Sequence, residues 1–143
     1  MITPVGIAGI GTYFPSQIET SADIAAPCEI PEEVLREKMG IRQRHTAGPD
    51  DSVTRMATLA SERALAQAGI TAAQVGLVVY HGSEFKDHNV WNAAAQIQHN
   101  LAAENAAAFE LHALCASAPI AMHTVRGMMQ VDDHYDYALL TVA

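Results

Sequence analysis

The sequence predicts an α/β fold with a largely parallel sheet, because segments with strand patterning alternate with segments with helix patterning. Residues 75–80 form a continuous apolar run of strand length, which is typical of a strand covered on both faces. The segments between the predicted strands are long enough for the crossover helices that parallel strands require. Half of the 143 residues are hydrophobic, so the chain can form one domain with a substantial core.

The amino-terminal part of the chain contains a predicted strand and a predicted short helix. Residues 5–10 are a β-prone apolar run that Gly11 closes, so we expect a first strand there. The helix is predicted to open at Pro31, which suits a first helical turn, and to end at Lys38 before Gly40.

A longer amphipathic helix is predicted after Asp51 or Ser52, either of which can cap it, and Gly69 ends it. Its alanines and Met56 share one face, which we expect to be buried, whereas Thr58 falls on the polar face. The later elements are predicted as a helix over 92–101, a strand over 106–111, a buried helix over 117–130 and a strand over 137–142.

Sixteen acidic residues against eight basic residues give the chain a formal net charge of −8. This balance argues against broad electrostatic attraction to nucleic acid or to an anionic membrane, so neither is an expected partner. No basic residue precedes the first apolar stretch, and the uncharged runs elsewhere are interrupted by polar residues. We therefore expect a cytoplasmic protein without a membrane anchor.

Gly6, Gly9 and Gly11 form the pattern GxxGxG at the predicted first strand. The order of the glycines differs from that of a dinucleotide fingerprint, and the residues that follow, TYFP, do not open a helix. A dinucleotide site is therefore disfavoured, and no permanently bound cofactor is expected.

His81, Glu84, Asp87 and His88 lie together in a polar stretch after the predicted strand over 75–80, which makes a metal site one hypothesis. Their spacing matches neither a closed zinc pattern nor a calcium loop, so we predict no metal. A solvated loop with scattered histidines is the simpler interpretation.

Cys115 lies where a strand-like segment meets an apolar helix, in FELHALCASAPIAMHTVRGMMQ. Pro119 is tolerated only in a first helical turn, so the helix must begin near Ser117, with Cys115 at or just before its amino end. A thiol there faces unpaired amides and the positive end of the helix dipole, which favour a nucleophilic thiolate. A buried structural cysteine is the alternative, since free cysteine is among the most buried residue types.

The second cysteine, Cys28, lies in a loop-like stretch between two prolines and is predicted to be an ordinary free thiol. A disulfide between Cys28 and Cys115 is not expected in a chain without an export signal.

Strand alternation separates Cys115 from the nearest histidine, His112. We therefore expect His112 to be a poor base for Cys115, although the two are three residues apart. The expected faces are Phe109, Leu111, Ala113 and Cys115 on one side, and Glu110, His112 and Leu114 on the other.

Four of the eight basic residues, Arg36, Lys38, Arg42 and Arg44, fall within the segment REKMGIRQR. One interpretation is a solvated helix end followed by a turn. The other is a local contact with phosphate groups or with an acidic partner, on a surface that is otherwise acidic.

Several segments, in order along essentially the whole chain, resemble the β-ketoacyl synthase III family of thiolase-fold condensing enzymes. They are GIAGIGTYFP, PEEVLREKMGIRQRH, a helix ending in ALAQAGI, VGLVVY, DHNVWNAAAQIQHNL and AFELHALCASAP. GIRQRH resembles the family's GIRxR turn, and AFELHALCA resembles the strand that leads to the family's nucleophilic cysteine.

The subunit of that family contains two similar halves with the active site between them. The resemblance implies that residues 1–143 form an amino-terminal thiolase-like half-domain, a mixed and mostly parallel sheet covered by helices, and that the carboxy-terminal half lies outside this chain. It also implies a homodimer joined beside the strand over 106–111.

The resemblance assigns Cys115 the acyl-accepting role, with a coenzyme A thioester as substrate and the backbone amide of Cys115 as one oxyanion donor. The acyl group would then pass to a carbanion formed by decarboxylation of a malonyl thioester, as in fatty acid biosynthesis. The family supplies the His and Asn for that step from its second half. No position of this chain matches them, so we expect this chain alone not to condense anything.

The resemblance also implies binding roles for several side chains. Lys38, Arg42 and Arg44 would meet coenzyme A phosphates or an acidic acyl carrier protein, and the loop around His88 and Val90 would reach the neighbouring subunit's acyl pocket. Lys38 stands where the family has an arginine. The bidentate contact that an arginine makes with a phosphate would therefore be replaced by the contact of a single ammonium charge.

Two other functions stay open at this level. A hydroxymethylglutaryl-CoA synthase-like enzyme would use an acidic base, and Glu84 lies near that region, although a solvated glutamate is the simpler interpretation. A non-catalytic partner subunit of a thiolase-fold heteromer would keep the fold without the chemistry. Since the resemblance implies a half-domain whose apolar faces the other half should cover, we also expect poor solubility or self-association of the isolated chain.

Overall fold

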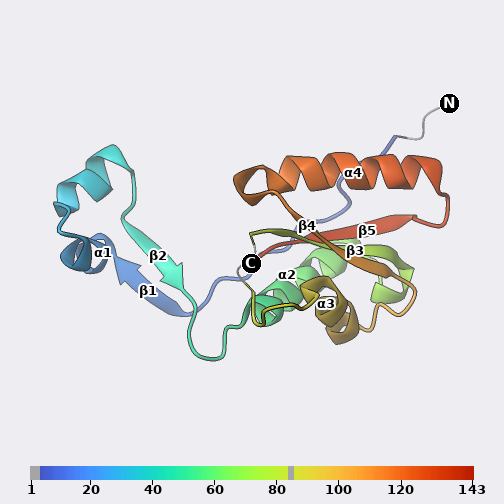
Figure 1. Cartoon of the computed structure of the whole chain (residues 1–143), viewed down its shortest axis with the longest axis horizontal. Helices are drawn as coiled ribbons and strands as arrows, with labels where there is room; N and C mark the ends of the chain where they lie inside the picture. The colour runs from blue at the N-terminus through green and yellow to red at the C-terminus, as the bar shows by residue number, and fades with distance from the viewer. Residues whose placement is uncertain (1–3, 84–85) are drawn as a thin grey trace. The chain divides into compact units, whose positions relative to one another are not determined.

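The computed structural model describes residues 4–83 and 86–143. The chain divides into two compact units (Figure 1). The smaller unit comprises Phe14–Asp51, and the larger unit comprises the other described residues. Each unit is described by itself.

The larger unit is built on a three-stranded parallel sheet in the order β4-β3-β5. β3 (Val75–Gly82) is the central strand, and it pairs in parallel with β4 (Ala107–His112) and with β5 (Tyr137–Thr141). All three strands therefore end at the same edge of the sheet. The predicted strands 75–80, 106–111 and 137–142 and their parallel arrangement are confirmed.

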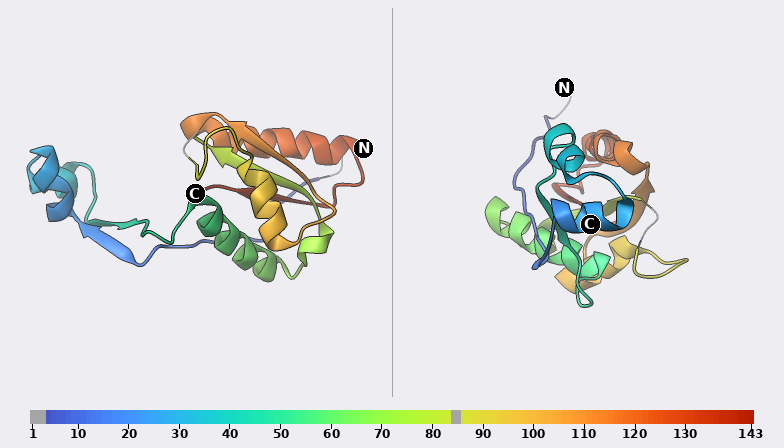
Figure 2. Two further views of the ribbon diagram at one scale, coloured as in Figure 1. Left: turned by 60° about the horizontal axis from the view of Figure 1, so that its bottom comes forward. Right: turned by 90° about the vertical axis from the view of Figure 1, so that its left-hand side faces the viewer.

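Helices cover both faces of this sheet (Figures 1 and 2). α2 (Val53–Ala68) and α3 (Ala93–Leu101) lie on one face, where Val78 and Tyr80 of β3 join their core. α4 (Ser117–Val131) lies on the other face, where Leu77 and Val79 pack with Val125. Side chains of β3 alternate between these two cores, which is why its sequence is continuously apolar.

The helix boundaries follow the capping residues of the sequence. Ser52 caps α2 by accepting a hydrogen bond from the Arg55 amide, and Gly69 ends the helix with a φ of 69°. Asn92 caps α3 in the same way. Within the described ranges, no helix is both long enough and apolar enough to cross a membrane.

The buried face of α2 differs from the expected one. Thr54, Thr58 and Ser61 are buried, so the prediction that Thr58 lies on the solvent-facing polar side is wrong. The hydroxyl groups of Thr58 and Ser61 donate to the carbonyl oxygens one turn earlier, at 2.7 Å each. This local pairing satisfies the hydroxyl donors and makes their burial tolerable.

The predicted first strand over 5–10 is also wrong, because these residues form an irregular segment against α2. The Ile10 amide donates to the side chain of Gln67 at 2.6 Å instead of joining a strand ladder. Gly9 and Gly11 allow this close approach, since a Cβ at Gly9 would lie 2.5 Å from the Ala64 carbonyl oxygen.

The smaller unit contains a two-stranded antiparallel sheet of β1 (Gln17–Thr20) and β2 (Gln43–Thr46), which the sequence patterns did not predict. α1 (Ser21–Cys28) follows β1, so Cys28 ends a helix and the expectation that it lies in a loop is wrong. The helix expected over 31–38 is present as the short helical turn η1 (Val34–Lys38), which has π-helical geometry.

Substitution of Gly11 by Ala should lower the free energy of unfolding by about 1–3 kcal/mol, because the added Cβ would collide with the backbone of α2 at Ala60. Gly6 has open space around its Cα, so Gly6→Ala is the matched control and should be nearly neutral. Urea denaturation of the two variants measures the difference. Equal stabilities would contradict this packing.

The isolated chain should self-associate, because several large apolar side chains of the larger unit are exposed. They include Ile10, Leu114, Ile120, Met122 and Val142. Exposed apolar surface of this kind drives association in water. Size-exclusion chromatography with light scattering measures the outcome, and a monodisperse monomer at high concentration would contradict it.

Candidate active site

Cys115 lies in a tight turn that connects β4 to α4. Leu114–Ala116 form one turn of 3-10 helix, η3, and α4 begins at the next residue, Ser117. The cysteine is a free thiol and is exposed, so the interpretation of Cys115 as a buried structural residue is wrong. The expected start of the helix near Ser117 is confirmed.

The backbone before Cys115 is strained. Leu114 has a φ of 50°, in the left-handed region that a leucine rarely adopts. The strand geometry ends at His112, so the expected alternation does not extend to Ala113, Leu114 and Cys115. The sharp turn leaves the cysteine exposed between strand and helix, as nucleophiles often are.

The amino end of α4 carries no side-chain cap. Its N-cap residue is Ala116, which has no side-chain acceptor, and Pro119 in the first turn has no amide hydrogen. The positive end of the helix dipole is therefore not offset by a capping oxygen. A thiolate or an oxyanion next to this turn is favoured electrostatically.

A buried histidine contacts the first residue of α4. The Nδ1 atom of His81, at the end of β3, lies 3.2 Å from the hydroxyl oxygen of Ser117, and both residues are buried. Burial lowers the pKa of His81. The pair joins the central strand to the helix that follows Cys115.

His112 is occupied elsewhere, as its place in the strand suggested. Its Nδ1 atom lies 3.0 Å from the Ser83 carbonyl oxygen, and its Nε2 atom lies 3.1 Å from a carboxylate oxygen of Glu110. Both ring nitrogens therefore have partners, and neither is left to act as a base for Cys115.

The two candidate acyl-pocket residues lie on the irregular segment before α3. The ring of His88 meets the ring of Trp91 edge-on, with centroids 4.9 Å apart. Val90 is fully exposed and has a φ of 27°. An exposed apolar side chain at this position is available to a partner or a ligand.

Asp87 has a structural role that the sequence did not suggest. Its carboxylate accepts hydrogen bonds from the amides of Val53 and Thr54 at 2.7 and 3.1 Å, and from the Thr54 hydroxyl at 2.5 Å. Burial opposes ionisation, but these hydrogen bonds and one from Ser52 outweigh it and lower the pKa of Asp87. Asp87 is thus a second cap of α2.

Two of the four candidate metal ligands after β3 are engaged in other contacts, since His81 pairs with Ser117 and Asp87 caps α2. Glu84, the candidate acidic base, lies outside the described residues. In the described part of the chain, the group of three acidic or histidine side chains whose potential ligand atoms lie close enough together to hold a metal ion is Asp132, Asp133 and His134, at a surface turn. His134 forms ion pairs with both aspartates, and the three side chains form an ordinary exposed cluster.

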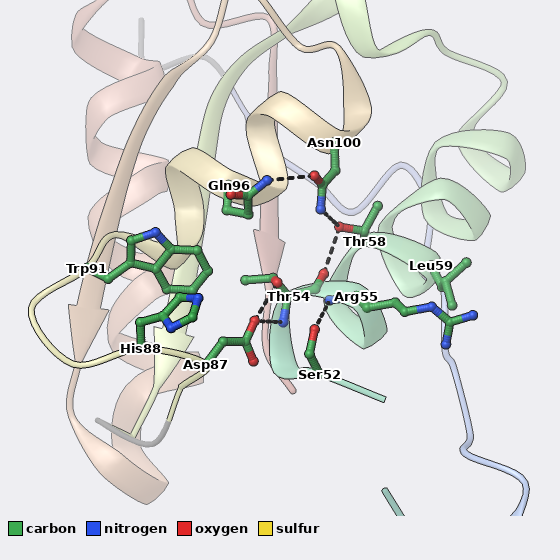
Figure 3. Close-up of a pocket in the computed structure, with 10 residues that line it drawn as sticks. All are labelled: Ser52, Thr54, Arg55, Thr58, Leu59, Asp87, His88, Trp91, Gln96 and Asn100. Atoms are coloured by element: carbon green, nitrogen blue, oxygen red, sulfur yellow. Dashed lines mark hydrogen bonds between the residues drawn. The ribbon is translucent and has the colours of Figure 1, made fainter. Parts of the chain in front are cut away.

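A groove of about 920 Å³ opens between the start of α2 and the exposed side of α3 (Figure 3). His88 and Trp91 form one wall of it, and Cys115 is not among the lining residues. The lining residues are Ser52, Thr54, Arg55, Thr58, Leu59, Asp87, His88, Trp91, Gln96 and Asn100.

The three candidate phosphate-binding residues lie in the smaller unit, and their side chains are exposed. Lys38 ends η1. Arg44 lies in β2 and forms an ion pair with Glu19, with 2.6 Å between the charged atoms. Among the residues that the structure describes, Lys38 and Arg42 form no ion pair, so their charges are available to a ligand.

Sequence reasoning missed the polar group around Glu110. This glutamate on β4 binds Lys86 and His112, and its other oxygen accepts the amide of Ala93 at the start of α3. The signal that could have revealed it is a glutamate in an otherwise apolar strand next to a loop lysine, since a largely buried carboxylate needs a partner.

The chain is similar in sequence to curated beta-ketoacyl-[acyl-carrier-protein] synthases III, although no family model matches it. It is 39% identical over 110 residues to the beta-ketoacyl-[acyl-carrier-protein] synthase III of Salmonella paratyphi A, covering 77% of this chain and 34% of that protein. A second such enzyme, from Streptomyces avermitilis, is 36% identical over 118 residues, with 82% and 37% covered. The chain thus spans about a third of the length of the curated relatives it matches.

Solved structures agree on the fold. The 3-oxoacyl-(acyl carrier protein) synthase III of Pseudomonas aeruginosa PAO1 matches with a TM-score of 0.80 and 26% identity, over 93% of this chain and 39% of that one. OleA of Xanthomonas campestris matches with a TM-score of 0.83 and 24% identity, over 97% and 43%. The fold is therefore the thiolase-like α/β fold, of which this chain represents a part.

The free energy of unfolding should fall as the pH drops below the ordinary histidine pKa of about 6.5, in part because of His81. Below this pH, His81 takes up a proton in the unfolded chain, whereas burial keeps His81 neutral in the folded chain. Protonation of His81 therefore favours the unfolded state. His81→Asn should reduce this fall, measured by urea denaturation between about pH 7 and about pH 5. His99→Asn, at an exposed position of α3, is the control, and equal pH dependence of wild type and His81→Asn would contradict the assignment.

Proposed function

Because this chain belongs to the β-ketoacyl-ACP synthase III family, we propose that it carries the acyl-accepting cysteine of a condensing enzyme. The chain spans about a third of the length of the curated members of that family. The substrate of the first step is a coenzyme A thioester, and Cys115 is the nucleophile.

The position of Cys115 is the observation that supports this proposal best. The thiol is exposed in a strained turn, directly before a helix whose amino end lacks a side-chain cap. Such a position suits both the attack of a thiolate and the stabilisation of negative charge next to it. Cys28 is also exposed, but it lies at the end of α1, where the dipole disfavours a thiolate.

In the first step, the Cys115 thiolate attacks the carbonyl carbon of the acyl thioester. A carbon–sulfur bond to Cys115 forms, and the carbonyl oxygen takes the negative charge, which backbone amides at the turn stabilise. The carbonyl re-forms as the bond to coenzyme A breaks, and coenzyme A leaves as a thiolate that takes up a proton.

In the second step, a malonyl thioester loses carbon dioxide, and the resulting carbanion attacks the acyl group on Cys115. A carbon–carbon bond forms, and Cys115 leaves again as a thiolate. Stabilisation of the enolate oxygen requires hydrogen-bond donors such as a neutral His and an Asn. Since His112 and His81 are engaged in other contacts, we propose that these donors come from outside residues 1–143.

The smaller unit and the edge strand supply the proposed binding surfaces. Lys38 and Arg42 are exposed cations available to the phosphates of coenzyme A or to an acyl carrier protein, whereas Arg44 would have to leave Glu19. β4 is an edge of the three-stranded sheet, so a second copy of the chain can pair beside it in a homodimer.

Incubation with an acyl-CoA should add one acyl group to Cys115, seen as a mass increase of the intact protein. Cys115→Ser should abolish the adduct, because serine at this position lacks an activated nucleophile. Cys28→Ser is the matched control, since it removes the other exposed thiol and should leave the adduct unchanged.

Absence of any Cys115-dependent adduct, also after addition of a protein that supplies the second half of the fold, would refute the enzymatic proposal. That result would favour a non-catalytic partner subunit. An adduct that survives Cys115→Ser but disappears in Cys28→Ser would place the reactive thiol in the smaller unit instead.

A further inference from the structure

A polar contact is buried in the otherwise apolar interface between β3 and α4. The Nδ1 atom of His81 lies 3.2 Å from the hydroxyl oxygen of Ser117. His81 is 7% exposed, and Ser117 is 5% exposed. Strand alternation places His81 on the same face of β3 as Leu77 and Val79, which pack against α4. Because a buried polar group needs a hydrogen-bond partner, each of the two side chains restricts the position of the other.

Ser117 also closes the turn that carries Cys115. Its backbone amide donates a hydrogen bond to the Leu114 carbonyl oxygen across η3. In the same turn, the Ala116 amide donates to the Ala113 carbonyl oxygen at 3.0 Å. Cys115 lies within both of these hydrogen-bonded turns. The side chain of Ser117 therefore connects the cysteine turn to the central strand of the sheet.

The turn requires such an anchor because its backbone is strained. Leu114 has a φ of 50°, which a leucine adopts only where the surrounding structure enforces it. The Leu114 side chain is 68% exposed, so its own packing does little to hold this conformation. Ala116 supplies no capping oxygen that would fix the start of α4. The contact between Ser117 and His81 instead fixes the first residue of α4 against β3.

We propose that the contact between His81 and Ser117 holds the strained turn in place and thereby sets the position of the Cys115 thiol at the amino end of α4. His81 and Ser117 are positioning residues in this scheme, because they act on the thiol through the backbone of the turn. The position of the turn does not depend on the proposed function, whereas its effect on acylation rests on that function.

A double variant separates this role from general stability. Removal of one partner leaves the other buried and unpaired, whereas replacement of both by apolar side chains can be nearly neutral. His81→Leu combined with Ser117→Ala therefore removes the contact and should leave the midpoint of urea unfolding close to that of the wild type. His81→Asn is the conservative variant, because its side-chain nitrogen is bonded to Cγ as Nδ1 is in histidine, and it should preserve the contact.

Amide hydrogen exchange in the full chain reports on the turn itself. In the double variant, the amides of Ala116 and Ser117 should exchange about tenfold faster, because the turn opens more often. The amide of Val125, which is buried farther along α4, should keep its wild-type rate. His81→Asn should leave all three rates close to those of the wild type.

Alkylation by iodoacetamide reports on the thiol without any acyl transfer. With Cys28→Ser in every variant, Cys115 is the remaining thiol. Its alkylation should be about fivefold slower in the double variant, because the thiol loses its fixed place at the helix end, and His81→Asn should restore the rate.

Ser61→Ala is the matched control for the alkylation. It removes a buried hydroxyl that contacts Thr141, but on α2, which covers the opposite face of the sheet from α4. The alkylation rate of Cys115 in Ser61→Ala should equal that of the wild type. Ser117→Ala alone is a second variant without the contact, and it should show the same faster exchange and slower alkylation as the double variant.

Each outcome supports or overturns a defined part of the proposal. Wild-type exchange and alkylation in both variants that lack the contact would overturn it. Faster exchange with unchanged alkylation would overturn the effect on the thiol, and slow alkylation in His81→Asn would overturn the assignment to a hydrogen bond. Acylation by acetyl-CoA should slow several-fold in the double variant. If the wild type forms no acyl adduct while exchange and alkylation respond as expected, the proposed function fails and the positioning role is supported.

Discussion

The central strand β3 is buried on both faces, because α2 and α3 cover one face and α4 covers the other, and this burial determines where the reactive residues can lie. Leu77 and Val79 cannot face water without opening the core under α4, and Val78 and Tyr80 cannot do so without opening the other core. The register of β3 is therefore tightly specified. Its parallel neighbours then bring the carboxyl ends of all three strands to one edge.

Polar and reactive groups gather at that edge, where backbone and side chains leave the sheet. β4 ends in the turn that exposes Cys115, β3 ends with His81 against Ser117, and Glu110 lies near the end of β4. Each largely buried polar group there has a partner of opposite charge or a hydrogen-bond partner, which makes the burial tolerable. In open parallel sheets, this edge is where ligands ordinarily bind. The proposed acyl transfer uses it in the same way.

Much of the fold could be predicted, because the relevant signals are local. Ser52, Asn92 and Gly69 set helix ends through contacts within a few residues, and the apolar run of β3 reflects cover on both faces. The failures are equally physical. The segment before Thr12 has strand-like composition, but the Ile10 amide binds Gln67, which lies 57 residues away along the chain. The residue types of β1 and β2 were too polar to suggest strands, although their backbones pair.

The sequence by itself determined that Cys115 stands before a helix, because Pro119 restricts the helix start. It also predicted that His112 is a poor base for Cys115, and the contacts of His112 with Ser83 and Glu110 in the folded chain occupy both ring nitrogens. Only the tertiary structure decided the partners of the charged residues. Asp87 caps a helix that begins 34 residues earlier, and Glu110 meets Lys86 across 24 residues of chain. Such pairings depend on which strand ends and helix starts come together in space, and no local pattern of residues carries that information.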